Sequence, residues 1–428
     1  MPVDSTSTLR NEERRLTQMS IQSSFVNHMN LQEQPALILG DRLRQLRAAR
    51  GLSLEELSAA LGGIVTRQAL WKYEKGKAQP SAAVLSRLAR VLDVRAAYLW
   101  RQPPVDVRFI AYRKGSGLLK RDQERVESRV SLALEQCVGL RQATGQVDFP
   151  DLPVQSHAVE SVEAAEQAAL EVRHRWSLGT DALGSLTGIV EDRGVHVVEI
   201  DADDKFDGIC AVAEDDEGNV VAAAVATRRG LPGDRQRLDL AHELGHLVLA
   251  VAEDVEEEKA AFRFAGALLA PADAVRQEVG AKRSSVSLGE LTLLKRRYGM
   301  SIQAWVQRLR DLDVITESHY RQWWITLNKL GYRKQEPAPL AAERPEWLQR
   351  TALRALAEGL VTREEAEQLT GEKLELVEPL SVVERRALAK LPVDERRRVL
   401  AEQAARIAGH YEHDEQWRDL DSGDVVEY

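Results

Sequence analysis

The sequence predicts a mostly α-helical α+β protein that is divided into several domains. Its 428 residues are too many for one hydrophobic core, because domains usually contain roughly 100–200 residues. Most of the chain has the apolar spacing of amphipathic helices, whereas residues 194–227 change to short runs of β-branched and small apolar residues. We therefore expect an all-α domain near the N-terminus, a domain with a small sheet in the middle and a helical C-terminal segment.

The composition is that of a soluble globular protein, with 44% hydrophobic and 29% charged residues. No apolar run approaches the roughly 18–20 residues that a membrane-spanning helix needs, and the N-terminus lacks the apolar core of a signal peptide. We therefore expect a cytoplasmic protein without a membrane partner. Cys137 and Cys210 stand far apart in apolar surroundings, so they predict two buried thiols and no cysteine metal site.

Charge is sorted along the chain. The net charge of −9 argues against nonspecific nucleic-acid binding by the whole surface. Residues 41–95 nevertheless hold eleven lysines and arginines against five acids, a local charge of +6. Residues 409–428 hold seven acids and one arginine, a local charge of −6. Such sorting is expected when separate domains meet different partners.

The N-terminal elements follow from periodicity and from capping residues. Residues 1–37 are polar without a sustained period, so we expect a flexible extension. Short helices are then predicted, since Ser53 with Glu56 forms a capping-box pattern and Thr66 and Ser81 suit helix starts. These helices cover residues 41–50, 53–61, 66–75 and 81–92.

The middle of the chain begins with a linker, residues 101–158, whose longest expected element is a helix from about 118 to 144. The β-branched and small apolar runs that follow predict strands at 195–200, 207–214 and 219–227. Helical spacing then returns. It predicts helices at 235–252, 255–269, 288–298, 302–312, 317–330, 345–358, 363–369 and 393–408.

The segment LAHELGHLVL contains the motif His-Glu-x-x-His at residues 242–246. Positions four apart lie on one helix face, so His242 and His246 can bind a single Zn²⁺. Glu243 is placed to accept a proton from the attacking water and to pass it to a leaving amine. A catalytic zinc needs a third protein ligand and one open position.

Acids in the next segment are the candidates for the third ligand. Glu258 shares a helix face with Phe262 and Ala265, so we expect its side chain to point inward, where a metal would compensate its charge. Glu257, Glu253 and Asp254 remain lesser candidates.

Three stretches carry a resemblance to a known family. RQRLDLAHELGHLVLA, EKAAFRFAGALLAP and SVSLGELTLLKRRYGMSIQAWVQRLRDLDVI resemble the ImmA/IrrE family of zinc metallopeptidases, which cut repressor-like proteins. The resemblance covers about residues 160–370 and implies a zincin-like peptidase domain in which Glu258 completes the metal ligands. The chain departs from the family at Ala260 and Phe262, where glutamate and asparagine are more frequent. These departures reduce the support that neighbouring side chains give to the metal ligands, but the three ligands themselves are unchanged.

Residues 42–94 resemble the XRE helix-turn-helix domain. This resemblance implies that the third helix enters the major groove of double-stranded operator DNA, and that the domain binds a two-fold operator as a homodimer. Arg67 and Gln68 suit guanine and adenine edges, whereas Arg47, Lys75 and Lys77 suit phosphates. The expected outward residues of this helix, with the lysine that follows it, are Thr66, Arg67, Gln68, Trp71, Lys72 and Lys75.

Two departures, Leu54 and the Gly62-Gly63 pair, predict a modified docking geometry on DNA. The alternative for this domain is a four-helix module that binds protein, which the local charge of +6 disfavours.

Residues 373–428 are similar to small antitoxins. A basic amphipathic helix leads into an acidic tail with aromatic residues, a combination suited to a basic toxin surface. The expected domains are a flexible extension (1–37), the helix-turn-helix domain (38–100), the helical linker (101–158), the peptidase domain (159–335), a helical family tail (336–372) and the antitoxin-like segment (373–428).

The leading hypothesis is a DNA-binding transcriptional regulator with a zinc-dependent endopeptidase domain that cleaves a repressor or antitoxin protein. One alternative is a non-enzymatic antitoxin and autorepressor with a structural zinc site. Another is a peptidase that cuts its own linker.

Overall fold

The computed structural model describes most of the chain. The described residues are 33–112, 119–146, 152–202, 206, 208–333, 335–370, 373–374, 390–398 and 400–401. The chain divides into two compact units, residues 1–372 and residues 373–428. Most of the expected extension and of the expected antitoxin-like segment lie outside the described residues. The elements below belong to the first unit.

The N-terminal helices pack around a leucine core. Ser53 and Glu56 form the predicted capping box, and the Thr66 and Ser81 side chains accept hydrogen bonds from backbone N–H groups of the first turns that follow them. Leu43 and Leu88 are fully buried in this core. The elements are α2 (Glu33–Ala49), α3 (Leu54–Ala60), α4 (Arg67–Glu74), α5 (Ala82–Val91) and the 3₁₀-helix η1 (Ala96–Trp100).

The flexible extension that was predicted for residues 1–37 is too long at its C-terminal end. Helix α2 already begins at Glu33, eight residues before the predicted start. Ala36 and Leu39 are buried, so the apolar face of the helix continues toward its N-terminus and packs there.

A four-stranded sheet has the order β1-β4-β5-β3, in which β4 is antiparallel to both neighbours and β3 is parallel to β5. The three predicted strands are confirmed as β3, β4 and β5. The strands are β1 (Asp106–Tyr112), β3 (Val195–Ile200), β4 (Gly208–Glu214) and β5 (Val220–Arg228).

The segment 101–158 is not the simple helical linker that the sequence predicted. It contributes the edge strand β1 and the helix α6 (Lys120–Thr144) to the sheet-containing domain. Phe109 of β1 and Val130 and Leu134 of α6 belong to one apolar cluster with the sheet. This burial against distant strands explains why periodicity alone did not assign the segment to the domain.

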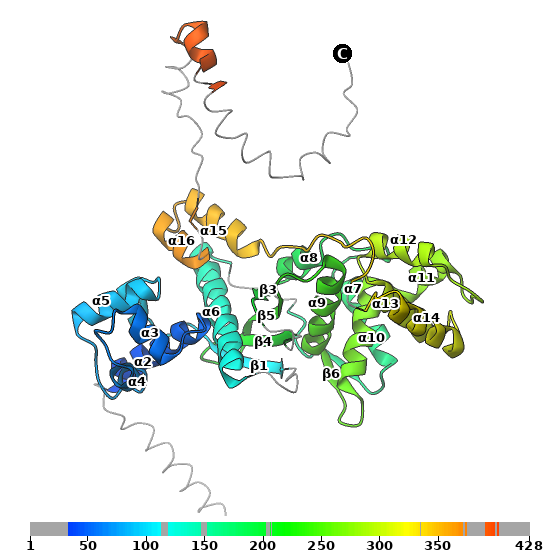
Figure 1. The fold of residues 1–428 in the computed structure, drawn as a ribbon, viewed down its shortest axis with the longest axis horizontal. Helices are drawn as coiled ribbons and strands as arrows, with labels where there is room; N and C mark the ends of the chain where they lie inside the picture. Colours follow the sequence, from blue (N-terminus) through cyan, green and yellow to red (C-terminus); the bar gives the residue numbers. More distant parts are fainter. Residues whose placement is uncertain are drawn as a thin grey trace, which may run out of the picture. The chain divides into compact units, whose positions relative to one another are not determined.

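The two faces of the sheet bury different helices. Alternate residues of β4 point to opposite faces, so Ile209 and Ala211 pack with α6, whereas Cys210 and Val212 pack with α9 and α10. Figure 1 shows α6 on one side of the sheet and α9 (Gly233–Val248) with α10 (Glu257–Leu269) on the other. Both cysteines, Cys137 and Cys210, are buried as predicted.

Helix α9 ends before its predicted end at residue 252. The backbone becomes extended at Leu249, and β6 (Leu249–Val251) pairs in parallel with β2 (His157–Val159). This pairing with a distant strand stops the helix. The helix α11 (Ala272–Val279) was also not predicted.

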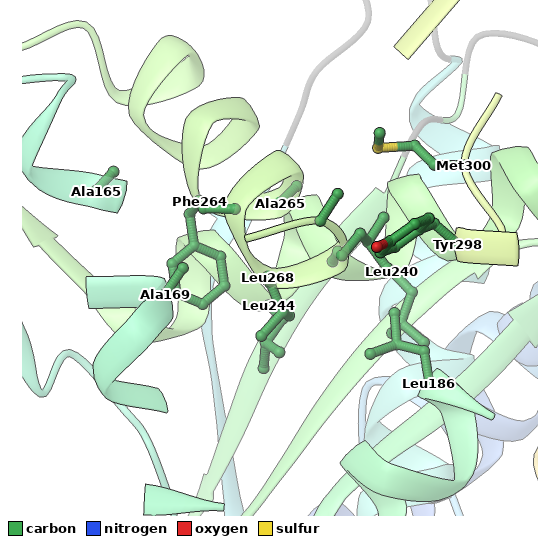
Figure 2. Packing of buried hydrophobic residues seen from close by; sticks show 14 of the residues in the cluster. Ala165, Ala169, Leu186, Leu240, Leu244, Phe264, Ala265, Leu268, Tyr298 and Met300 are labelled. Carbon is green, nitrogen blue, oxygen red and sulfur yellow. The ribbon is translucent and has the colours of Figure 1, made fainter. Parts of the chain in front are cut away.

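The remaining helices are α7 (Ala164–Arg175), α8 (Leu186–Asp192), α12 (Leu288–Tyr298), α13 (Ile302–Asp311), α14 (Glu317–Lys329), α15 (Trp347–Ala357) and α16 (Arg363–Thr370). Helices α7, α8 and α11–α14 complete the core on the α9 side, whereas α15 packs against α6, α8 and α16. Tyr298 and Met300 lie in the same apolar cluster as Leu240 and Leu244 (Figure 2). No described helix is long and apolar enough to cross a membrane.

Candidate metal centre

Helix α9 brings the two motif histidines together. The Nε2 atoms of His242 and His246 are 3.1 Å apart, and only 3% of each side chain is exposed. Two imidazole nitrogens on successive turns of one buried helix therefore point to one place.

Helix α10 adds a carboxylate to this pair. The Glu258 oxygens lie 3.5 Å from Nε2 of His242 and 3.6 Å from Nε2 of His246. In the described part of the chain, these three residues form the cluster whose potential ligand atoms all lie within 4.8 Å of one another. The structure therefore gathers the three residues that the sequence predicted as metal ligands.

The separations fit a zinc ion. Ligand atoms about 2.0–2.1 Å from a common tetrahedral centre are roughly 3.3 Å from each other. The two Nε2 atoms are 3.1 Å apart, and each has a Glu258 oxygen close to that separation, Oε2 at 3.5 Å from His242 and Oε1 at 3.6 Å from His246. Two imidazoles and one carboxylate are also the ligand types of catalytic zinc sites, which leave the fourth position open.

Close packing of the two helices makes this geometry possible. A Cβ atom at Gly245 would lie only 3.2 Å from the Ala261 backbone and from the Phe264 ring. Figure 2 shows Phe264 and Leu268 beside Leu244 in the contact between α10 and α9. The glycine inside the motif therefore lets α10 approach closely enough to deliver Glu258.

The expected inward orientation of Glu258 is wrong in detail. Its side chain is 48% exposed, and Phe262, which shares its face, is also exposed. The buried face of α10 is formed instead by Ala261, Phe264 and Ala265 with their neighbours. Glu258 and Phe262 lie at the rim of this face, where the Phe262 ring packs on the His242 ring with centroids 4.0 Å apart.

The other acids in this segment take different positions. Glu257 Oε1 lies 3.1 Å from Nδ1 of His246, the ring nitrogen opposite the one that faces Glu258. Such a carboxylate can orient a metal-binding histidine and fix its tautomer. Glu253 and Asp254 lie in the exposed segment between β6 and α10, outside the three-residue cluster.

Glu243 is buried beside β4. Only 2% of the residue is exposed, and a Cβ atom at Gly208 would lie 2.3 Å from its Oε1 atom. The first residue of β4 must therefore be a glycine for the Glu243 side chain to keep this position. Local sequence patterns could not identify Gly208, because it is 35 positions away from the glutamate it accommodates.

Buried charges hold the beginning of α9. Asp234 accepts a hydrogen bond of 3.0 Å from Lys295, which also bonds Glu336 at 3.0 Å. Arg237 pairs with Glu343. Burial alone would raise the pKa of Glu343, but Arg237 and backbone N–H groups at the start of α8 hold that pKa below its usual value. These contacts fix the helix whose next turns carry the motif.

The side chains that the sequence predicted to point outward from α4 are exposed to solvent. Thr66, Arg67, Gln68, Trp71, Lys72 and Lys75 are all exposed. Leu70 is buried, and Ala69 and Tyr73 pack partly against the core. The Lys77 ammonium lies 4.8 Å from the centroid of the Trp71 ring. A polar face with one aromatic ring is therefore presented to solvent.

Arg47 does not belong to this face. Its Nε lies 2.5 Å from Oε1 of Glu74, and its Nη1 donates a hydrogen bond of 2.7 Å to the Leu52 carbonyl. Its side chain is only 12% exposed. The expectation of a phosphate contact is therefore wrong for Arg47, because both ends of its guanidinium are used inside the domain.

Two stretches of the chain match known protein families. Residues 43–99 match the family described as Helix-turn-helix, and residues 190–310 match the family described as IrrE N-terminal-like domain. This chain joins a helix-turn-helix domain to an IrrE N-terminal-like domain. The resemblance drawn from the sequence is thereby confirmed, and the second match contains the α9 motif and Glu258. No solved structure matches the chain.

Curated relatives resemble the chain over a short stretch. An SPbeta prophage-derived uncharacterized HTH-type transcriptional regulator of Bacillus subtilis is 37% identical over 62 residues, which are 14% of this chain and 56% of the relative. Uncharacterized HTH-type transcriptional regulators of Sinorhizobium medicae and Rhizobium meliloti are each 34% identical over 68 residues, which are 16% of this chain and 48% of each relative. The chain thus spans about half the length of these relatives.

Proposed function

We propose that this protein is a DNA-binding transcriptional regulator whose second domain is a zinc-dependent endopeptidase that cleaves a repressor or antitoxin protein. The observation that supports the enzymatic part most strongly is the convergence of His242, His246 and Glu258 next to a buried Glu243. The match to the IrrE N-terminal-like domain covers all four residues.

Each residue has a defined role in this proposal. His242, His246 and Glu258 would hold a zinc ion, which when bound would supply Lewis-acid activation of the scissile carbonyl. Glu243 accepts a proton from the attacking water and donates it to the leaving amine. Glu257 orients the His246 ring from its Nδ1 side.

The proposed DNA contacts lie on α4. Its exposed N-terminal residues Arg67 and Gln68 reach base edges in the major groove, while Lys72 and Lys75 contact phosphates or adjacent bases. Arg67 lies 2.8 Å from Glu55 in the free protein, so it must exchange this exposed ion pair for the DNA contact. A homodimer on a two-fold operator is the assembly that this kind of domain favours.

Two variants test the enzymatic part. Purified wild-type protein is expected to hold about one zinc ion per chain by elemental analysis, and Glu243→Gln is expected to hold the same amount. New protein N-termini in cells that express the wild type should be absent with Glu243→Gln. The matched control is Glu256→Gln, because Glu256 is exposed and pairs with Lys259 outside the cluster.

The same experiment distinguishes the proposed endopeptidase from the alternative, a non-enzymatic regulator. If Glu243→Gln and the wild type both retain zinc and produce the same set of N-termini, the chain is a non-enzymatic regulator with a structural metal site. Co-purification of a toxin through residues 373–428 would then support the antitoxin hypothesis.

A further inference from the structure

A large cavity lies on the side of the sheet opposite the metal centre. Its volume is about 950 Å³, within the range of about 300–1,000 Å³ typical of small-molecule sites. Residues of α2, η1, α6, β3, α15 and α16 line it, so its walls come from both the helix-turn-helix domain and the sheet-containing domain. In Figure 1, α6 separates the N-terminal helices from the sheet, and α15 and α16 lie at its C-terminal end.

Three arginines gather at this cavity and at a smaller one beside it. Arg50 and Arg129 line the large cavity, while Arg125 lines an adjoining cavity of about 280 Å³. Arg125 and Arg129 are four residues apart on α6 and therefore share a helix face. Arg125 also lies close to Gly51, directly after Arg50.

None of these three guanidinium groups has a carboxylate within ion-pair distance among the residues that the structure describes. Arg229, which lines both cavities, differs because it pairs with Asp201 at 3.1 Å. The Nε atom of Arg125 is buried and has no hydrogen-bond partner in the described part of the chain. Arg50 donates one hydrogen bond, from Nη1 to the Leu46 carbonyl at 3.3 Å, and Asp93 lines the cavity as well, so the donors left for a ligand are the other N–H groups of Arg50 and those of Arg129.

Their charges also oppose one another. Burial lowers the pKa of Arg50, the nearby carboxylate of Asp93 raises it, and the charge of Arg129 lowers it by a smaller amount. Burial likewise lowers the pKa of Arg129, with further lowering by Arg125 and Arg229. An anion among these groups would relieve the repulsion.

We propose that this cavity binds a small molecule of nucleotide size through its phosphate groups. Phosphate suits Arg50 and Arg129, which line this cavity, better than a single carboxylate does, because it carries more charge and more acceptor oxygens for the guanidinium forks. Leu132, Leu348 and Val361 line the same cavity and offer apolar contact to the rest of the molecule. The site is independent of the proposed peptidase chemistry.

Binding there would stabilise the packing of the two domains. Arg50 follows α2 in the helix-turn-helix domain and Arg129 lies on α6, and both line the cavity, so a ligand with several phosphate groups would contact both walls. The ligand would thus favour the arrangement in which these walls face each other.

Calorimetric titration of the full-length protein tests the site, with ATP and inorganic tripolyphosphate as separate probes. ATP is expected to bind at one site per chain, and the Arg50→Gln/Arg129→Gln double variant is expected to bind it at least tenfold more weakly. The matched control is Arg87→Gln/Arg90→Gln, which removes the same charge from exposed positions on α5 and should leave binding unchanged. Tripolyphosphate alone should bind at the same site more weakly, since it lacks the organic part.

Folding of the variant can be checked independently. Without ligand, the double variant should unfold at the same temperature as the wild type or higher, because two mutually repelling charges are removed. Arg129→Lys keeps the charge but not the planar fork, so it should weaken ATP binding less than the double variant does.

Three results would overturn the proposal. The first is that the titration detects no binding of ATP, or a stoichiometry other than one ATP per chain. The second is that the control variant loses as much affinity as the double variant, which would indicate nonspecific attraction. The third is that neither probe binds while the double variant loses affinity for random duplex DNA, which would make the arginines DNA-backbone contacts.

Discussion

The metal centre and the α4 face illustrate two ways of building a functional surface. At the candidate metal centre, the buried histidines of α9 meet the half-exposed Glu258 of α10, and the close approach of the two helices depends on Gly245. On α4, polar side chains point into solvent from a single capped helix, and the helix period alone determines which residues are exposed. The first arrangement is fixed by packing and the second by local structure.

This difference predicts opposite sensitivities. Substitutions near the metal centre should change stability and geometry together, because each buried group has several fixed neighbours. Substitutions on the α4 face should change stability little and affect only binding.

The largest difference in the free energy of unfolding should be found between substitutions of a buried and an exposed lysine. Lys295 is buried between Asp234 and Glu336, whereas Lys72 is exposed on α4. Lys295→Met leaves two buried carboxylates without their cation and should lower the free energy of unfolding by about 3–5 kcal/mol. Lys72→Met should change it by less than about 0.5 kcal/mol. Chemical denaturation measures both, and equal losses would contradict the contrast.

The next effect should come from Gly208→Ala. The added Cβ would collide with the Glu243 side chain, so the carboxylate must move. Overpacking should cost about 1–3 kcal/mol of stability, and displacement of Glu243, the proposed general base, should reduce the proposed cleavage by about 100-fold. Zinc content should stay unchanged, since Gly208 does not adjoin the ligand cluster. Full cleavage activity in this variant would mean that the position of Glu243 is unimportant.

An acid pH should weaken the sheet-containing domain in particular. Burial holds the pKa of His196 well below its usual value, with a further lowering by Arg141. The unfolded chain takes up a proton as the pH falls through about 6.5, whereas the folded chain does not, so stability is full above that pH and falls below it. The loss should reach up to about 1.4 kcal/mol per pH unit.

His196→Gln should reduce this loss in unfolding experiments between pH 7.5 and pH 5.5. Residues 33–100, which include the helix-turn-helix helices, contain no histidine, whereas burial also lowers the pKa of His157, which adds to the loss in the same direction. An identical pH dependence in the wild type and the variant would show that His196 is not its source.

A smaller effect is expected for Glu257→Gln. This change weakens the hold on the His246 ring without removing a proposed ligand, so zinc affinity should fall by about tenfold. Competition with a chelator measures the affinity, and Glu256→Gln serves as the control. A loss as complete as that of a ligand variant would instead identify Glu257 as the third ligand.

The sequence was informative where local spacing controls the structure. It predicted the histidine pair, the exposed side chains of α4 and the strands β3, β4 and β5, since each depends on a short period within one element. Edge strand β1, the role of Gly208 and the internal pairing of Arg47 with Glu74 depend on residues distant in sequence. For Glu258, the proximity to the histidines was predicted, but its exposure was not, because the buried face of α10 is rotated away from it.

The most direct test of the proposed metal centre is an anomalous difference map at the zinc absorption edge from crystals of the purified protein. We predict one strong peak per chain, about 2.0–2.2 Å from Nε2 of His242, Nε2 of His246 and an oxygen of Glu258. A peak elsewhere, or zinc-loaded crystals with no peak among these three side chains, would contradict it.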